Sequence, residues 1–248
     1  MTRLGVQLHT LRTLEEPLPD TLARVADTAF EGVEFAALDE TSPSKLRETL
    51  ADLGLANVGG HVGFDRFADE YDEIVETYDA LGCDRLLIPT FDGALFETEA
   101  GAREAAGQLS SLADRLADDG FDLGYHNHSF EFTQLGTRTA FDAFVDALDG
   151  VDLELDIGLA THAGADPLEL LERYGDRAPL IHVTDTVPGS RETLHVDLGE
   201  GVVDIDACVE RAVENEAEWL VFEQGLTNDP MRSVEQAADR LSGLLERL

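Results

Sequence analysis

Residues 125–132, YHNHSFEF, place two imidazoles, an amide and a carboxylate within one short segment. This segment continues an apolar run that begins at residue 121. Packing alone does not require so many side chains of the types that bind metals or transfer protons. Similar groups end three later apolar runs, namely Asp156 in LELDIG, His182 in LIHVTD and Glu223 in LVFEQG. We expect these four places to meet around one divalent metal ion.

The two later carboxylates carry much of this expectation. Asp156 and Glu223 each end an apolar run, where a lone buried carboxylate is costly unless it is paired or bound to a metal. Strand alternation over residues 151–156 places Asp152, Glu154 and Asp156 on the same, inward face. His182 is either a hydrogen-bonded core histidine or a ligand, and we interpret it as a ligand. Histidine and carboxylate donors without cysteine suit Mn²⁺, Mg²⁺, Co²⁺ or Zn²⁺.

The remaining histidines also fall in or just after predicted strands, and none lies inside a predicted helix. His61 has glycines on both sides, which let the backbone approach a ligand closely. His9 and His195 lie in loops after strands, where each either contacts a ligand or bonds a loop carbonyl. We predict substrate contacts from His9, His61, Asn127 and His195.

Short apolar runs alternate with longer amphipathic runs along the chain. They predict strands at residues 4–8, 32–35, 55–62, 84–89, 121–127, 151–156, 179–184 and 219–223. They predict helices at residues 18–30, from 42–43, at 65–81, 98–119 and 139–148, from 167, and at 204–215 and 229–247. Strict alternation implies parallel strands with right-handed crossovers. We predict an α/β protein, a single (β/α)8 TIM-barrel domain over residues 1–248, with the active site at the carboxyl ends of the strands.

The charge balance is strongly acidic, with 52 acidic against 17 basic residues and a net charge of −35. The acidic residues are spread over many predicted helices, which favours a solvated surface adapted to high intracellular salt, a halophilic trait. A basic partner is the alternative interpretation. Nucleic acid is not an expected partner, because phosphate binding requires a cationic surface.

The sequence has no run near the roughly 20 apolar residues that span a bilayer, and its start lacks an apolar signal core. We therefore expect a cytoplasmic protein without a membrane partner. Cys83 and Cys208 lie in unrelated segments, so we predict reduced, buried thiols.

These motifs resemble the xylose isomerase-like barrel superfamily, which contains sugar and sugar-phosphate isomerases and epimerases, inosose dehydratases and the AP endonuclease family 2 nucleases. The resemblance runs from GVQLHTLR to LVFEQG and is most specific in YHNHSFEF, LDIGLATHAGADP, HVTD, LGEGVVD and VFEQ. It implies one metal, held by a Glu, an Asp, a His and a Glu from the fifth to the eighth strand. Asp156, His182 and Glu223 match the last three of these positions.

The fifth-strand position departs from the family pattern, since the family's Glu-Asn is here His126-Asn127. Either His126 replaces that ligand or Glu131 swings in from the turn, and we favour His126. Thr184 stands where relatives often have Lys in HxKD. This second departure weakens any inference about a phosphate or oxyanion bound there.

The resemblance implies proton abstraction next to a carbonyl, with a metal stabilising the enediolate. Glu223 is one candidate acid or base, and Glu131, His126 or His128 is the other. We predict an isomerase or epimerase that acts on a small sugar, sugar phosphate or keto-polyol. Barrels of this kind often associate as dimers or tetramers, so a homo-oligomer is a candidate assembly. The alternatives are a sugar or inosose dehydratase and a catalytically decayed sugar-binding barrel.

Overall fold

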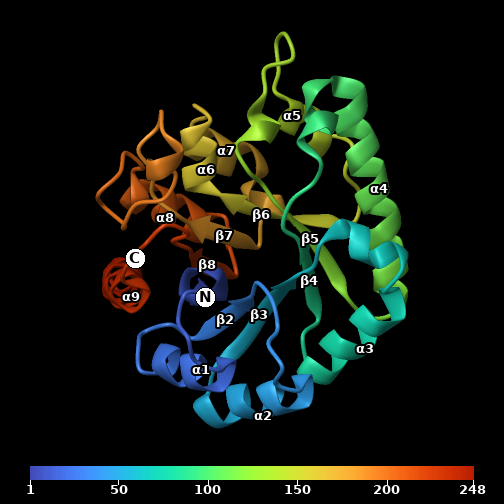
Figure 1. The fold of residues 1–248 in the computed structure, drawn as a ribbon. Coiled ribbons are helices and arrows are strands. Elements are labelled where there is room, and N and C mark those ends of the chain that lie inside the picture. Colours follow the sequence, from blue (N-terminus) through green and yellow to red (C-terminus); the bar gives the residue numbers. More distant parts are fainter.

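The computed structural model describes residues 1–248, and its centre is a closed barrel of parallel strands (Figure 1). The strands pair in chain order, and the first also pairs with the last. They are β1 Arg3–Gln7, β2 Gly32–Phe35, β3 Ala56–His61, β4 Arg85–Ile88, β5 Asp122–His126, β6 Val151–Asp156, β7 Leu180–Val183 and β8 Trp219–Phe222. The predicted (β/α)8 fold is confirmed, and no strand extends more than one residue beyond its predicted range.

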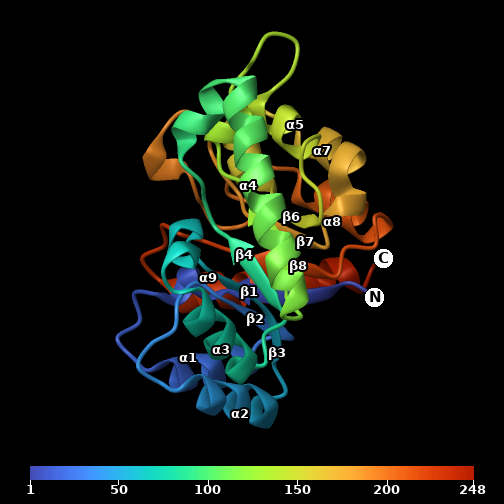
Figure 2. The ribbon, with the colours of Figure 1, turned by 90° about the vertical axis from the view of Figure 1, so that its right-hand side faces the viewer.

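Helices surround the barrel and return the chain from the carboxyl end of each strand to the start of the next (Figure 1). They are α1 Leu18–Ala26, α2 Pro43–Leu53, α3 Tyr71–Leu81, α4 Glu99–Asp118, α5 Ala140–Val145, α6 Ile157–His162, α7 Pro167–Tyr174, α8 Ile205–Glu214 and α9 Pro230–Leu245. Figure 2 shows the longest, α4, lying along the outside of the barrel. Each predicted helix is present in some form.

Helix α6 was not predicted, and it begins directly after β6. The Asp156 side chain accepts a hydrogen bond from Leu159 N at 2.6 Å, so the last strand residue also caps the helix. His162, expected in the segment just after the strand, ends this helix. Its Nδ1 lies 2.9 Å from Thr186 Oγ1, which gives the ring a structural partner.

Two apolar clusters fill the molecule. A cluster of 64 buried residues lies largely between the strands and the helices. A smaller one, made only of strand residues, we call the barrel floor: Val58, Leu87, Leu180, Trp219 and Val221. Glycine makes room for it, because a Cβ at Gly124 would lie 2.6 Å from Leu87 Cδ2.

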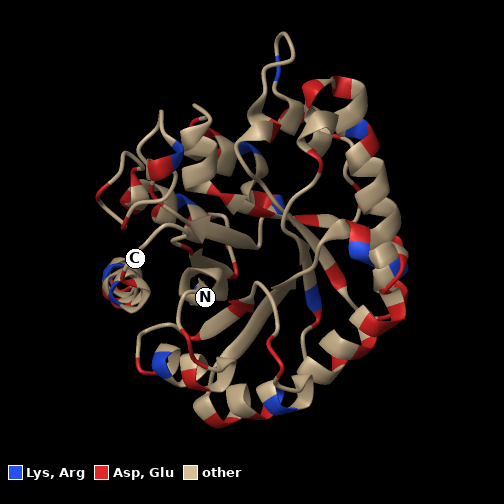
Figure 3. Ribbon diagram, viewed as in Figure 1, with Lys and Arg blue, Asp and Glu red and all other residues tan.

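Acidic residues are distributed over the outer helices and loops, with basic residues interspersed (Figure 3). Both cysteines are buried and unpaired, as predicted. None of the helices is both long and apolar enough to cross a membrane. In contrast to these outer residues, Glu34, Glu154 and Asp156 lie on strands of the barrel and are buried.

Candidate metal centre and cavity

The four favoured ligands converge at the carboxyl end of the barrel. His126 ends β5, Asp156 ends β6, His182 lies near the end of β7, and Glu223 follows β8. One donor atom of each lies within 4.8 Å of the donor atoms of the others. His182 Nδ1 is 3.3 Å from Glu223 Oε2. We call these four residues the mouth group.

Asp156 is held with one oxygen engaged and the other free. Its Oδ1 accepts hydrogen bonds from Thr184 Oγ1 and from Leu159 N, both at 2.6 Å. Its Oδ2 is buried and has no hydrogen-bond partner. An unsatisfied buried carboxylate oxygen is costly, so this atom fits a bound cation.

Thr184 has a role that the sequence did not reveal. Besides donating to Asp156, its hydroxyl accepts a hydrogen bond from Gly158 N at 2.9 Å. Gly158 is required by this close approach, since a Cβ there would lie 2.3 Å from Thr184 Oγ1. The residue that replaces the family's Lys therefore fixes the orientation of a candidate ligand.

Asn127 pairs with the backbone of Asp156 instead of facing the cavity. Its Oδ1 accepts from Asp156 N at 2.9 Å, and its Nδ2 donates to Asp156 O at 3.2 Å. The side chain is buried. Its amide thus joins the end of β5 to the end of β6, and this placement does not fit the predicted contact with substrate.

Both carboxylate oxygens of Glu131 accept hydrogen bonds from nearby residues of the same segment. Its Oε1 accepts from Tyr125 Oη at 2.6 Å and its Oε2 from His128 N at 2.9 Å. Complete burial raises the pKa of this carboxyl to about 7, against the opposing effect of these hydrogen bonds. Glu131 is not part of the mouth group. The structure therefore brings His126, and not Glu131, to the fifth-strand ligand position, and it does not place Glu131 for acid–base catalysis.

A cavity of about 260 Å³ lies against the mouth group. Its walls are formed by His9, Arg12, His126, His128, Leu159, Leu194, His195, Glu223, Gly225 and Leu226. Five residues with predicted substrate or acid–base roles are therefore in its wall: His9, His126, His128, His195 and Glu223. The walls do not include His61, Asn127 or Glu131. The volume suits one small ligand.

The cavity wall combines an ionised carboxylate, Glu223, with the neutral imidazole of His128. Burial, together with the nearby His126, lowers the pKa of His128 to about 3. Burial opposes ionisation of Glu223, but its hydrogen bond with His182 and the charge of that ring hold its pKa below the usual range. His195 is fixed by Gly225 N, which donates to its Nδ1 at 3.2 Å.

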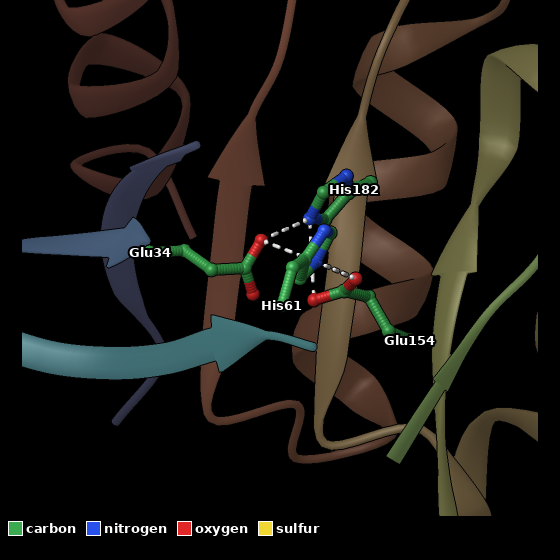
Figure 4. A group of neighbouring side chains, drawn as sticks. All are labelled: Glu34, His61, Glu154 and His182. Carbon is green, nitrogen blue, oxygen red and sulfur yellow. Dashed lines mark hydrogen bonds and ion pairs between the residues drawn. The ribbon is translucent and has the colours of Figure 1, made fainter. Parts of the chain in front are cut away.

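A second group lies deeper in the barrel and shares His182 with the first (Figure 4). It consists of Glu34, His61, Glu154 and His182, and we call it the inner group. His61, predicted to contact substrate, points instead to Glu34 and Glu154, with its Nε2 3.1 Å from each. Glu34 lies within β2, in the strand predicted over residues 32–35, and it is fully buried. A carboxylate inside the short apolar run GVEF was the signal that could have indicated this.

In the inner group, the charged imidazoles and the charged carboxylates stabilise each other. Burial disfavours the charged forms, yet Glu154 holds the pKa of His182 well above its usual value, and His182 holds that of Glu154 well below. Despite burial, Glu34 and Glu154 raise the pKa of His61 to about 10. Glu154 Oε2 also lies 3.1 Å from His126 Nδ1, so Glu154 contacts both groups.

The mouth group has the donors of a divalent-metal site. It supplies two imidazoles and two carboxylates, and Asp156 Oδ2 is buried without another partner. Histidine and carboxylate donors of this kind bind zinc and similar divalent ions. The geometry therefore supports a divalent metal at the mouth of the barrel.

Family comparison agrees with this barrel. The family model described as "Xylose isomerase-like TIM barrel" matches residues 22–244. The chain belongs to this family. A curated relative, the inosose dehydratase of Clostridium botulinum, is 28% identical over 153 residues, which cover 54% of this chain and 51% of the relative. The chain thus spans about half the length of that relative.

Solved structures show the same fold. A sugar phosphate isomerase/epimerase from Parabacteroides distasonis has a TM-score of 0.80 at 20% identity, covering 96% of this chain and 93% of the other. The IOLI protein, solved with a zinc atom bound, has a TM-score of 0.75 at 16% identity, covering 98% and 96%. At these identities the likeness shows the fold of the xylose isomerase-like barrel alone.

Proposed function

We propose that the protein is a metal-dependent isomerase or epimerase that removes a proton next to a carbonyl group of a small sugar, sugar phosphate or keto-polyol. The observation that carries this proposal is the mouth group, which forms part of the wall of a small cavity that also holds acid–base side chains. The isomerase/epimerase neighbour of the same fold supports the reaction class.

The metal ligands in this proposal are His126, Asp156, His182 and Glu223, and the ion is Mn²⁺, Mg²⁺, Co²⁺ or Zn²⁺. When bound, such an ion acts as a Lewis acid that polarises a carbonyl oxygen and stabilises the negative charge that develops beside it. Thr184 and Asn127 keep Asp156 in position through its side chain and its backbone.

Proton transfer falls to groups that reach the cavity from different strands. Glu223 follows β8 and His128 follows β5, so they enter from separate parts of the barrel mouth. In an epimerase one of these groups accepts the α-proton, and the group on the other side must first take a proton from solvent in order to return one to the opposite face. In an aldose–ketose isomerase a single group can accept the proton from one carbon and return it to the next. His9 and His195 provide further donors or acceptors for substrate hydroxyls.

The apolar part of the wall has its own function. Leu159, Leu194 and Leu226 line the cavity beside these polar groups. Leu159 is buried, whereas Leu226 is exposed, so these side chains extend from inside the cavity to its solvent-facing rim. They offer a substrate apolar contacts beside the polar groups.

A dehydratase is the second candidate, and the inosose dehydratase relatives favour it. The first step is the same proton abstraction. A neutral histidine such as His128 does not supply the proton needed by a leaving hydroxyl, so this reaction requires a protonated group or water in that place.

The test is turnover of ketoses, ketose phosphates and an inosose in deuterated buffer with Mn²⁺, followed by NMR. An epimer or isomer with deuterium at the α-carbon and all oxygens retained supports the proposal. An enone product with loss of water replaces it by the dehydratase. Thermal stabilisation by metal without turnover of any of these compounds supports a decayed sugar-binding barrel.

A further inference from the structure

We propose that the inner group is a second divalent-cation site, distinct from the one at the mouth. Its four donors come from β2, β3, β6 and β7 and point toward one another inside the barrel (Figure 4). Glu34, Glu154 and His182 are fully buried, and His61 is about one-tenth exposed. This inference concerns cation binding and does not depend on the reaction proposed above.

The spacing of the donors is that of ligands around one small ion. His182 Nε2 lies 2.9 Å from Glu34 Oε2 and 3.2 Å from Glu154 Oε1. His61 Nε2 lies 3.1 Å from each of the two carboxylates. Ligands bound tetrahedrally at about 2.0–2.1 Å from a metal stand roughly 3.3 Å apart. The four nitrogen-to-oxygen distances in the group are therefore close to that separation.

Protons alone satisfy this arrangement poorly. An imidazole nitrogen carries at most one proton, yet each of the two Nε2 atoms faces two different carboxylates. Two N–H groups cannot point along four contacts at once. A cation at the centre interacts with all four donors.

Charge is compatible with a cation in this group. Glu34 and Glu154 are completely buried, and uncompensated buried charges cost several kcal/mol each. Two protonated imidazoles balance the two carboxylates when no ion is bound. With the inner site alone occupied, one divalent cation takes the place of those two protons and leaves both rings neutral.

Two carboxylate oxygens of the group are not satisfied by hydrogen bonds. Glu34 Oε1 is buried and has no hydrogen-bond partner, and Glu154 Oε1 is buried with only the 3.2 Å ion-pair contact to His182 Nε2. Gln7 Nε2 donates to Glu34 Oε2 and so orients this carboxylate from outside the group. Carboxylates that bind metals are commonly oriented by such hydrogen bonds.

The ring of His182 connects the two sites. Its Nδ1 faces Glu223 in the mouth group, whereas its Nε2 faces the inner group. With both sites occupied, the ring is an imidazolate and its remaining proton has gone to solvent. The two cations are then bound by opposite sides of one side chain.

Metal content of the full-length protein tests this inference. After loading with Zn²⁺ and desalting, native mass spectrometry should find two ions per wild-type chain. Glu34→Gln should bind one, Asp156→Asn should bind one, and the double variant none. Glu48→Gln, which changes an exposed carboxylate on α2 paired with Lys45, is the matched control and should keep two.

Several outcomes would overturn the second site. They are one ion per wild-type chain that Glu34→Gln retains, or two ions in Glu34→Gln. Circular dichroism checks folding of each variant, and His61→Gln, at the accessible edge of the group, replaces Glu34→Gln if that variant does not fold. Because the readout is ion count, failure here leaves the proposed reaction standing, and failure of turnover leaves the ion count standing.

Discussion

The barrel floor and the mouth group occupy the same barrel but differ in every property that matters for function. The floor consists of apolar side chains packed against glycines. The mouth consists of imidazoles and carboxylates, with buried atoms that lack partners. Packing surrounds the floor, whereas the mouth keeps a buried carboxylate oxygen, Asp156 Oδ2, that has no hydrogen-bond partner. The difference indicates that stability and chemistry are separated along the barrel axis, as in other TIM barrels.

The largest effect is expected at the mouth. Asp156→Asn removes a charged donor but keeps a side chain that can cap α6, so the fold should persist. We expect kcat/KM for the identified substrate to fall at least about 1000-fold, which is about 4 kcal/mol of transition-state stabilisation. Steady-state kinetics with saturating metal measure this. Retention of more than a tenth of the activity would remove Asp156 from the site.

A substitution in the barrel floor should lower stability and leave metal binding unchanged. Leu87→Ala leaves a cavity beside Gly59 and Gly124, where the native side chain fits closely. We expect a loss of about 2–5 kcal/mol in the free energy of unfolding, with unchanged metal content in the folded protein. Urea denaturation and metal analysis measure the two quantities. Loss of metal at unchanged stability would show that floor and mouth are not separate.

Features that depend on neighbouring residues in the chain could be predicted from the sequence. The alternation of runs predicted the barrel, and the strand ends predicted His126, Asp156, His182 and Glu223 as a group, which the structure brings together. The metal itself remains a proposal.

The roles that sequence did not predict depend on contacts between strands. The pairing of Asn127 with the backbone of Asp156, the hydroxyl of Thr184 and the hydrogen bonds of Glu131 follow from register and side-chain direction. Glu34 and His61 meet Glu154 only because the closed barrel brings β2 and β3 opposite β6. No spacing along the chain indicates such a meeting.

A smaller loss of function is expected when the hydrogen bond that orients Asp156 is removed. Thr184→Val keeps the shape but removes the hydroxyl that donates to Asp156 Oδ1. We expect divalent-metal affinity to fall about 10–100-fold, as is typical when a residue that orients a ligand is lost. Isothermal titration calorimetry measures it. Thr161→Val, which removes a hydroxyl bonded only to the α6 backbone, is the control, and equal losses in both variants would contradict the role of Thr184.

The smallest effect concerns Glu131 and pH. Burial raises the pKa of this carboxyl from 4.5 to about 7. The folded protein therefore binds the proton more tightly than the unfolded chain, and stability should fall as pH rises through this window. Glu131→Gln, which resembles the protonated acid, should show a flatter dependence. Urea denaturation at several pH values measures it, and identical slopes in both proteins would contradict the raised pKa.

The most direct test of the account is a crystal structure of the protein grown with Zn²⁺ or Mn²⁺. We predict a metal ion at the barrel mouth, roughly 2.0–2.3 Å from donor atoms of His126, Asp156, His182 and Glu223. The account is contradicted if the loaded protein holds no ion among these four residues, or if Glu131 takes the place of His126 around it.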